Sequence, residues 1–122
     1  MAGRVVHFEI PIDEADRAGM FYRDVFGWQV QQWGSEPYWT TNAGDKAGPG
    51  TDGALAPRKD TPAVMVYVSV DDIDATLERI KEAGGDPLTG RMPVPTMGWS
   101  ARFRDPEGNQ LGLFQEDPSV GT

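Results

Sequence analysis

Cysteine is absent from this sequence, and histidine occurs only once. The lack of cysteine excludes disulfides, thiolate metal sites, iron–sulfur clusters and cysteine nucleophiles. It also fits a reducing compartment. The N-terminal segment MAGRVVHFEI lacks the apolar core and small-residue cleavage site of a signal peptide. No apolar run approaches the ~20 residues that span a bilayer. We therefore expect a cytoplasmic protein.

Positive charge is also scarce, because 11 Lys and Arg stand against 19 Asp and Glu, giving a formal net charge of −8. Nucleic-acid binding depends on neutralising phosphates, and anionic membrane surfaces attract basic segments. The acidic balance therefore argues against a nucleic acid or a membrane as the partner. What remains is a chain of 122 residues with an apolar fraction of 39%, which predicts one small domain with its own core.

The first half of the chain predicts a strand, a helix and three further strands. Apolar residues alternate along Arg4–Ile12, as in a strand with one apolar and one mixed face. Asp13 is the candidate N-cap of a helix over about 14–25, and Gly27 is its stop signal. The helix should pack through Ala18, Phe21, Tyr22 and Val25, which share one face. Strands are then expected over 28–33, 37–41 and 54–56.

The pattern restarts in the second half. Val64, Val66, Val68 and Val70 alternate with Met65, Tyr67 and Ser69, which predicts a strand over 63–70. A helix should begin at Asp71 or Asp72 and stop at Gly84 and Gly85. Strands are expected near 87–88, 99–104 and 110–115, with a DPEGN turn between the last two. The Gly- and Pro-rich segment 42–53 is expected to be a rim or lid loop, or else a plain surface loop.

The restart indicates an internal repeat with an offset of 58 residues. This offset places Asp13 on Asp71 and Gly27 on Gly85, at the cap and the stop of the two helices. The predicted fold class is therefore α+β, with two tandem βαβββ modules that form a curved mixed sheet, a partial barrel with a concave pocket. Module one should cover about 4–57, the linker 58–62, module two 63–115, and a loose tail 116–122.

Three segments together resemble the vicinal oxygen chelate superfamily, which contains glyoxalase I, bleomycin-resistance proteins and extradiol dioxygenases. They are HFEIPIDEADRAGMFYRDVFGW, VYVSVDDIDATLERIKEAGG and FRDPEGNQLGLFQ, and they cover nearly the whole chain. The resemblance implies the fold strongly. It leaves the function open, because this fold carries catalysis, sequestration and binding alike.

The resemblance also implies where a divalent metal would bind. Enzymes of this superfamily use a His on the first strand, a His on the equivalent strand of the second half, a Glu on the last strand and often a Glu or Gln at the end of the first half. Here these positions fall on His7, Met65, Gly112 and the stretch 53–55. Only His7 is a usual ligand, and Glu9 on the same strand face adds a second, which makes a weak site. We therefore expect no metal cofactor.

The predicted ligand is a small, flat organic molecule, because aromatic rings and a methionine on a concave face favour stacking and a soft fit. Each of these residues taken alone also fits a plain core position. The candidate ligand-binding residues are His7, Glu9, Trp39, Met65, Tyr67, Trp99, Phe103 and Phe114. His7 and Glu9 are also the only candidates for catalysis, and for both the alternative is a structural role in packing or hydrogen bonding.

Two functions are therefore left open. The first is a metal-independent binding or resistance-type protein, working as a homodimer in which Trp33 or Met97 could complete the partner's pocket, as the resemblance implies. The alternative is a metal-dependent glyoxalase-like lyase or isomerase, or a dioxygenase, that uses His7 and Glu9. An interaction module within a larger complex has little support, because the chain has no charged blocks.

Overall fold

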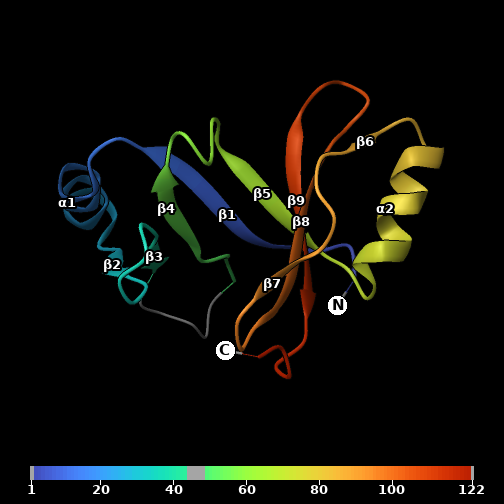
Figure 1. The fold of residues 1–122 in the computed structure, drawn as a ribbon. Coiled ribbons are helices and arrows are strands. Elements are labelled where there is room, and N and C mark those ends of the chain that lie inside the picture. The colour runs from blue at the N-terminus through green and yellow to red at the C-terminus, as the bar shows by residue number, and fades with distance from the viewer. Residues whose placement is uncertain (1, 44–48, 122) are drawn as a thin grey trace. The chain divides into compact units, whose positions relative to one another are not determined.

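A computed structural model describes residues 2–43 and 49–121. The chain divides into two compact units: one runs from His7 to Met65, and the other contains the residues up to Val6 and from Val66 onward. Each unit combines one helix with a mixed β-sheet (Figure 1). The α+β class predicted from the sequence is thereby confirmed. Residues 44–48, in the predicted rim loop, lie outside the described part of the chain.

The His7–Met65 unit has the predicted βαβββ order. Its elements are β1 (Val5–Ile12), α1 (Ala15–Phe26), β2 (Gln29–Gln32), β3 (Trp39–Asn42) and β4 (Gly53–Pro57). The strands lie in the order β2-β3-β4-β1. The pairs β2–β3 and β3–β4 are antiparallel, whereas β1 and β4 run parallel. The central strand β4 is buried along most of its length, because it has a hydrogen-bonded neighbour on each side.

Helix α1 begins one residue later than the sequence predicts. Its N-cap is Glu14, whose side chain makes no capping hydrogen bond, so the expectation that Asp13 caps the helix is wrong. Asp13 instead pairs with Arg58, with 3.2 Å between Asp13 Oδ1 and Arg58 Nε. The predicted stop is confirmed: Gly27 ends the helix with a φ of 72°, a left-handed conformation that glycine adopts without strain.

Only part of the predicted apolar face of α1 packs on its own unit. Gly19 is buried, where an added Cβ would lie 3.5 Å from Val30. Tyr22 stacks on Trp28, with ring centroids 5.0 Å apart. Phe21 and Val25 are both 55% exposed, contrary to the prediction. The helix therefore contacts the sheet through its small residues and Tyr22, which leaves larger apolar side chains in solvent.

The second unit carries one strand that was not predicted. Its elements are β5 (Met65–Ser69), α2 (Ile73–Glu82), β6 (Asp86–Pro87), β7 (Met92–Val94), β8 (Gly98–Arg104) and β9 (Gln110–Glu116). The strands follow the order β5-β9-β8-β6, and β7 also pairs with β8. The missed strand is β7, because its sequence MPV and the proline after it read as a loop. An edge position tolerates Pro93.

The core of this unit lies between α2 and the sheet. Ile73, Leu77, Ala101 and Leu113 form a buried cluster. The side chain of Asp72 caps α2 by accepting from the Ala75 N–H, as predicted, and Gln115 Oε1 accepts from the Ile73 N–H. The DPEGN turn is confirmed by the hydrogen bond from the Gly108 N–H to the Asp105 carbonyl. Beyond β9, Val120 is buried and its carbonyl accepts from the Thr96 N–H.

Neither helix in the described ranges is long and apolar enough to cross a membrane.

Candidate ligand site

Strand β1 separates two kinds of side chain onto opposite faces of its sheet. Phe8 contacts Trp28, and Ile10 lines a pocket together with α1, so these residues face the helix. His7 and Glu9 alternate with them and face the other way. Glu9 is opposite Ala54 in the parallel pair of β1 and β4. The two polar residues expected in the site therefore share the sheet face that α1 does not cover.

A chain of hydrogen bonds links His7 and Glu9 through a tyrosine that the sequence did not single out. The hydroxyl of Tyr38 lies 2.6 Å from His7 Nε2 and donates to Glu9 Oε2 at 2.8 Å. The hydroxyl of Thr61 donates to the other carboxylate oxygen, Glu9 Oε1, at 3.2 Å. Glu9 and Thr61 are 5% and 1% exposed, whereas His7 and Tyr38 are half-buried. The chain thus runs from a partly accessible imidazole to a buried carboxylate.

Local hydrogen bonds hold the backbone of Tyr38 and Thr61, the two residues that supply the hydroxyl groups. Tyr38 directly precedes β3, and its carbonyl accepts from the Trp33 N–H, which closes the turn between β2 and β3. Thr61 follows β4, and its N–H donates to the Pro57 carbonyl. Both residues belong to segments predicted as a strand start and a linker, which is why their side-chain positions could not be read from the sequence.

The hydrogen bonds of Tyr38 assign a tautomer to neutral His7. A tyrosine hydroxyl has one proton, and when Tyr38 donates it to an ionised Glu9, its oxygen accepts from His7 Nε2–H. Neutral His7 therefore has Nδ1 as its acceptor nitrogen. Burial lowers the pKa of His7 from the ordinary value of 6.5, and the negative charge of Glu9 opposes this only in part. The site consequently holds a neutral imidazole at pH 7.

The lowered pKa of His7 makes a prediction about stability and pH. The unfolded chain takes up the His7 proton more readily than the folded chain, so stability should fall as pH drops through 6.5 toward the folded-state pKa. Urea unfolding between pH 7.5 and 5 should show this loss in the wild type and a smaller loss in His7→Gln. An equal pH dependence in both proteins would contradict a lowered pKa for His7.

An exposed aromatic ring lies beside the hydrogen-bond chain of His7, Tyr38 and Glu9. Trp33 is 40% exposed, and its ring centroid lies 5.6 Å from that of Tyr38 at an angle of 55°. Tyr38 is in turn stacked near the His7 ring, with centroids 6.3 Å apart and planes 18° apart. The rings of Trp33, Tyr38 and His7 thus follow one another, and we refer to the three as the aromatic surface. Trp33 was expected only as a residue that a partner chain could contribute.

The other predicted ligand contacts divide between two sheet faces. Tyr67 and Phe114 share a face of the second unit, because Tyr67 pairs with Gly112 and Ser69 with Phe114. This is the face that α2 does not cover, as the alternation predicted. Tyr67 is buried and Phe114 half-buried there. Met65, at the start of β5, is also buried.

Three predicted residues lie on the wrong face for the site. Trp99 and Phe103 pack against the core cluster under α2, opposite to Tyr67 and Phe114. Trp39 pairs with Leu55, which also pairs with Ile10, so it shares the α1-facing side. The side chain next to it in sequence, Tyr38, points to His7 instead. Adjacent aromatic residues in a strand point to opposite faces, and the sequence does not tell which one faces the site.

The residues at the four metal positions do not fit a divalent ion of the kind the resemblance implies. His7 has its Nε2 engaged with Tyr38, Met65 offers a soft thioether, and 53–55 offers the side chains of Gly, Ala and Leu. Within residues 2–43 and 49–121, no group of three or more His, Cys, Asp or Glu side chains is arranged to hold a metal.

The metal position on the last strand, Gly112, is closed by a ring. A Cβ added at Gly112 would lie 2.2 Å from Cδ2 of Tyr67. Real Cβ atoms do not approach other atoms so closely, so the ring of Tyr67 takes the space that a side chain at 112 would need. A carboxylate at this position and the present placement of Tyr67 exclude each other.

Comparison with known proteins places this geometry in a family context. The chain is 29% identical to a glyoxylase-like domain-containing protein of Didymella fabae, over 88% of this chain and 89% of that protein. It is 27% identical to the anthracycline biosynthesis protein DauV of Streptomyces sp. strain C5, over 98% of this chain. It spans about half (49%) of DauV.

The fold is shared with solved structures. A glyoxalase/bleomycin resistance protein/dioxygenase superfamily member from Vibrio splendidus 12B01 matches 94% of this chain and 99% of its own, with a TM-score of 0.66 at 18% identity. The sequence profile of the same superfamily matches residues 4–113. This chain therefore belongs to the glyoxalase/bleomycin resistance protein/dioxygenase superfamily.

Proposed function

We propose that this protein binds a small, flat organic molecule on the aromatic surface of Trp33, Tyr38 and His7, without a metal ion. The observation that carries the proposal is the hydrogen-bond chain from His7 through Tyr38 to the buried Glu9, with an exposed tryptophan beside it. A homodimer, expected from the superfamily resemblance, is part of this proposal.

The two ends of this surface suit different parts of one ligand. The exposed ring of Trp33 can stack on a flat aromatic system. The half-buried His7 and Tyr38 offer polar atoms for a ligand hydroxyl or carbonyl, held in place by the buried Glu9. A few fixed polar groups beside an apolar surface are typical of small-molecule sites. The expected ligand is therefore a fused-ring compound with phenol or quinone oxygens.

The relatives support this ligand class. DauV and DnrV are named for anthracycline biosynthesis, and anthracyclines are flat, oxygenated fused-ring compounds. Both relatives are about twice as long as this chain, so their whole activity is not transferred. What we carry over is the shape and polarity of the ligand, which match the aromatic surface with its polar end.

The test is a titration of the EDTA-treated protein with 1,4-dihydroxyanthraquinone, followed by tryptophan fluorescence. We expect saturable quenching at micromolar concentrations, because the ring would stack on Trp33. Trp33→Ala should weaken binding about fivefold through lost stacking. The matched control is Trp99→Phe, since Trp99 packs under α2 and should leave the affinity unchanged. Absence of saturable binding, or equal losses in both variants, would refute the proposal.

A second candidate function is acid–base catalysis at the same residues. The directed hydrogen-bond chain favours it, because neutral His7 has an acceptor nitrogen backed by Tyr38 and Glu9. His7 would then accept a proton from a bound ligand, and Glu9 would stabilise the resulting imidazolium. This version requires His7→Gln to keep the ligand affinity within a few-fold while abolishing turnover. Loss of binding alone would assign His7 to recognition.

A further inference from the structure

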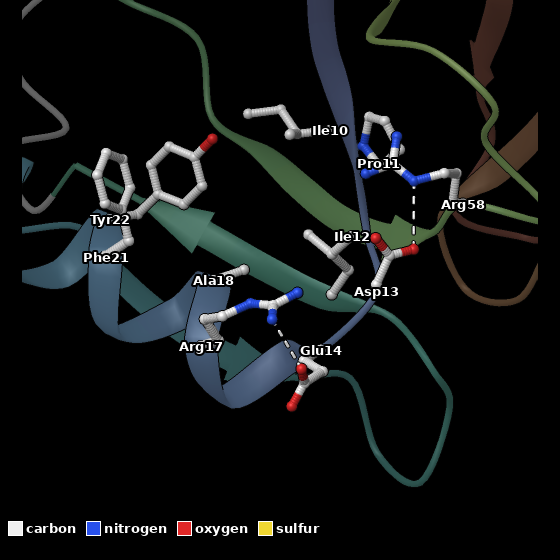
Figure 2. A pocket seen from close by; sticks show the side chains of 10 residues that line it. All are labelled: Ile10, Pro11, Ile12, Asp13, Glu14, Arg17, Ala18, Phe21, Tyr22 and Arg58. Atoms are coloured by element: carbon white, nitrogen blue, oxygen red, sulfur yellow. Dashed lines mark hydrogen bonds and ion pairs between the residues drawn. The ribbon is translucent and has the colours of Figure 1, made fainter.

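A cavity lies on the face of β1 opposite to His7 and Glu9, between that strand and helix α1. Its volume is about 310 Å³, which is near the lower end of the ~300–1,000 Å³ seen for ligand pockets. Figure 2 shows it lined from β1, from the first two turns of α1 and from the segment after β4. The cavity lies within the His7–Met65 unit, away from the side of the sheet that presents His7 and Glu9.

Six of the ten residues that line this cavity are apolar or aromatic, and the other four are Asp13, Glu14, Arg17 and Arg58. Ile10 and Ile12 contribute from β1, and Ala18, Phe21 and Tyr22 contribute from α1. The rings of Phe21 and Tyr22 meet edge to face, with centroids 5.1 Å apart and planes at 88°. Phe21 is 55% exposed. A large aromatic side chain left in solvent at the edge of a cavity gains contact area when a ligand ring packs beside it.

Two guanidinium groups stand at the cavity. Arg17 comes from α1, and Arg58 comes from the segment after β4 (Figure 2). The main chain at Arg58 is held to β1, because the backbone N–H of Arg58 donates to the Ile12 carbonyl at 3.1 Å. The two arginines thus line the same cavity from different elements, beside the carboxylates of Asp13 and Glu14 (Figure 2).

Each guanidinium keeps donors for a ligand. Arg17 Nη1 pairs with Glu14 at 2.8 Å, and Arg58 Nε pairs with Asp13 at 3.2 Å. A guanidinium has five N–H donors, and among the described residues each arginine uses one nitrogen in these pairs. Both pairs are exposed and contribute little energy, so a second anion can compete for the same donors.

We propose that this cavity is a binding site for a small aromatic carboxylate. The ring would lie against Ile10, Ile12 and Tyr22, and the carboxylate would accept hydrogen bonds from Arg17 and Arg58. Guanidinium groups match a carboxylate with paired, charge-assisted hydrogen bonds, which a neutral ligand of the same shape cannot make. This proposal does not depend on the proposed function, because the two sites use opposite faces of β1.

The test uses 2-naphthoate as the probe, with amide chemical shifts of the ¹⁵N-labelled full chain as the readout. We expect saturable shifts at 10, 12, 17–22 and 58, with no comparable shifts at 7, 9 and 38. The neutral 2-naphthylmethanol and the cationic 2-naphthylmethylammonium should bind at least about tenfold more weakly. Equal binding of either analogue, or shifts confined to 7, 9 and 38, would overturn the proposal.

Paired variants separate the role of the two arginines from that of net charge. Arg17→Gln with Arg58→Gln should weaken 2-naphthoate binding by about tenfold or more. Arg23→Gln with Lys59→Gln removes the same charge from neighbouring positions that do not line the cavity, and should change the affinity less than twofold. Equal losses in the two double variants would show that general electrostatics holds the probe, which would also overturn the proposal.

Discussion

Replacing Gly112 by alanine is expected to destabilise the protein by about 3 kcal/mol, which is the upper range for overpacking a core. The added methyl group would lie 2.2 Å from Cδ2 and 2.3 Å from Cε2 of Tyr67. Tyr67 is buried, so its ring cannot turn away into solvent. Urea unfolding followed by circular dichroism should therefore show a large decrease in the free energy of unfolding for Gly112→Ala.

Two further variants test whether the ring is the cause. Gly90→Ala adds a methyl group where no atom lies within 4 Å, and its effect should be close to zero. Combining Gly112→Ala with Tyr67→Ala should cost less than the sum of the two single changes, because the clash is absent once the ring is removed. Additive effects in the double variant would show that Gly112 matters for another reason.

Replacing Tyr38 by phenylalanine is expected to cost about 2 kcal/mol of stability and to weaken binding of the anthraquinone probe about tenfold. The change removes one hydroxyl that serves two hydrogen bonds, one from His7 Nε2–H and one to Glu9 Oε2. Glu9 is buried, so its carboxylate cannot replace the lost donor with bulk water. Unfolding and probe titration of the same preparation measure both effects.

The control for this change is Tyr22→Phe. Within residues 2–43 and 49–121 the Tyr22 hydroxyl makes no hydrogen bond, and the ring keeps its stacking on Trp28. Stability should therefore change little, and the anthraquinone affinity should be retained. A similar loss for Tyr22→Phe and Tyr38→Phe would mean that the chain from His7 to Glu9 contributes nothing particular to the fold or to binding.

The architecture could be predicted to a large extent because local signals agree with it. The cap at Asp72, the stop at Gly27 and the DPEGN turn each have a backbone reason that is visible in sequence. The strand β7 was missed because two prolines in MPVP conceal a short edge strand. Asp13 does not cap the helix, because Glu14 is the N-cap; the Asp13 carboxylate instead pairs with Arg58, 45 positions away.

The candidate site was less predictable, because it depends on which face each aromatic residue takes. His7 and Glu9 alternate on one strand, and their shared face follows from that spacing alone. Tyr38 could not be chosen over Trp39 from the sequence, since both fit the same short strand. Only the pairing of β3 with β4 determines which of the two side chains faces His7. Trp99 and Phe103 fill the space under α2, a tertiary requirement that the alternation of their strand does not reveal.

The contact between Tyr67 and Gly112 constrains the order in which these two residues can be substituted. A carboxylate at 112, the position where the superfamily resemblance puts a metal ligand, is sterically blocked while the ring is in place. A lineage or a designer must first exchange Tyr67 for a smaller residue and only then introduce glutamate at 112. The reverse order passes through a protein that does not fold well, so the mutational path between the two kinds of site runs in one direction.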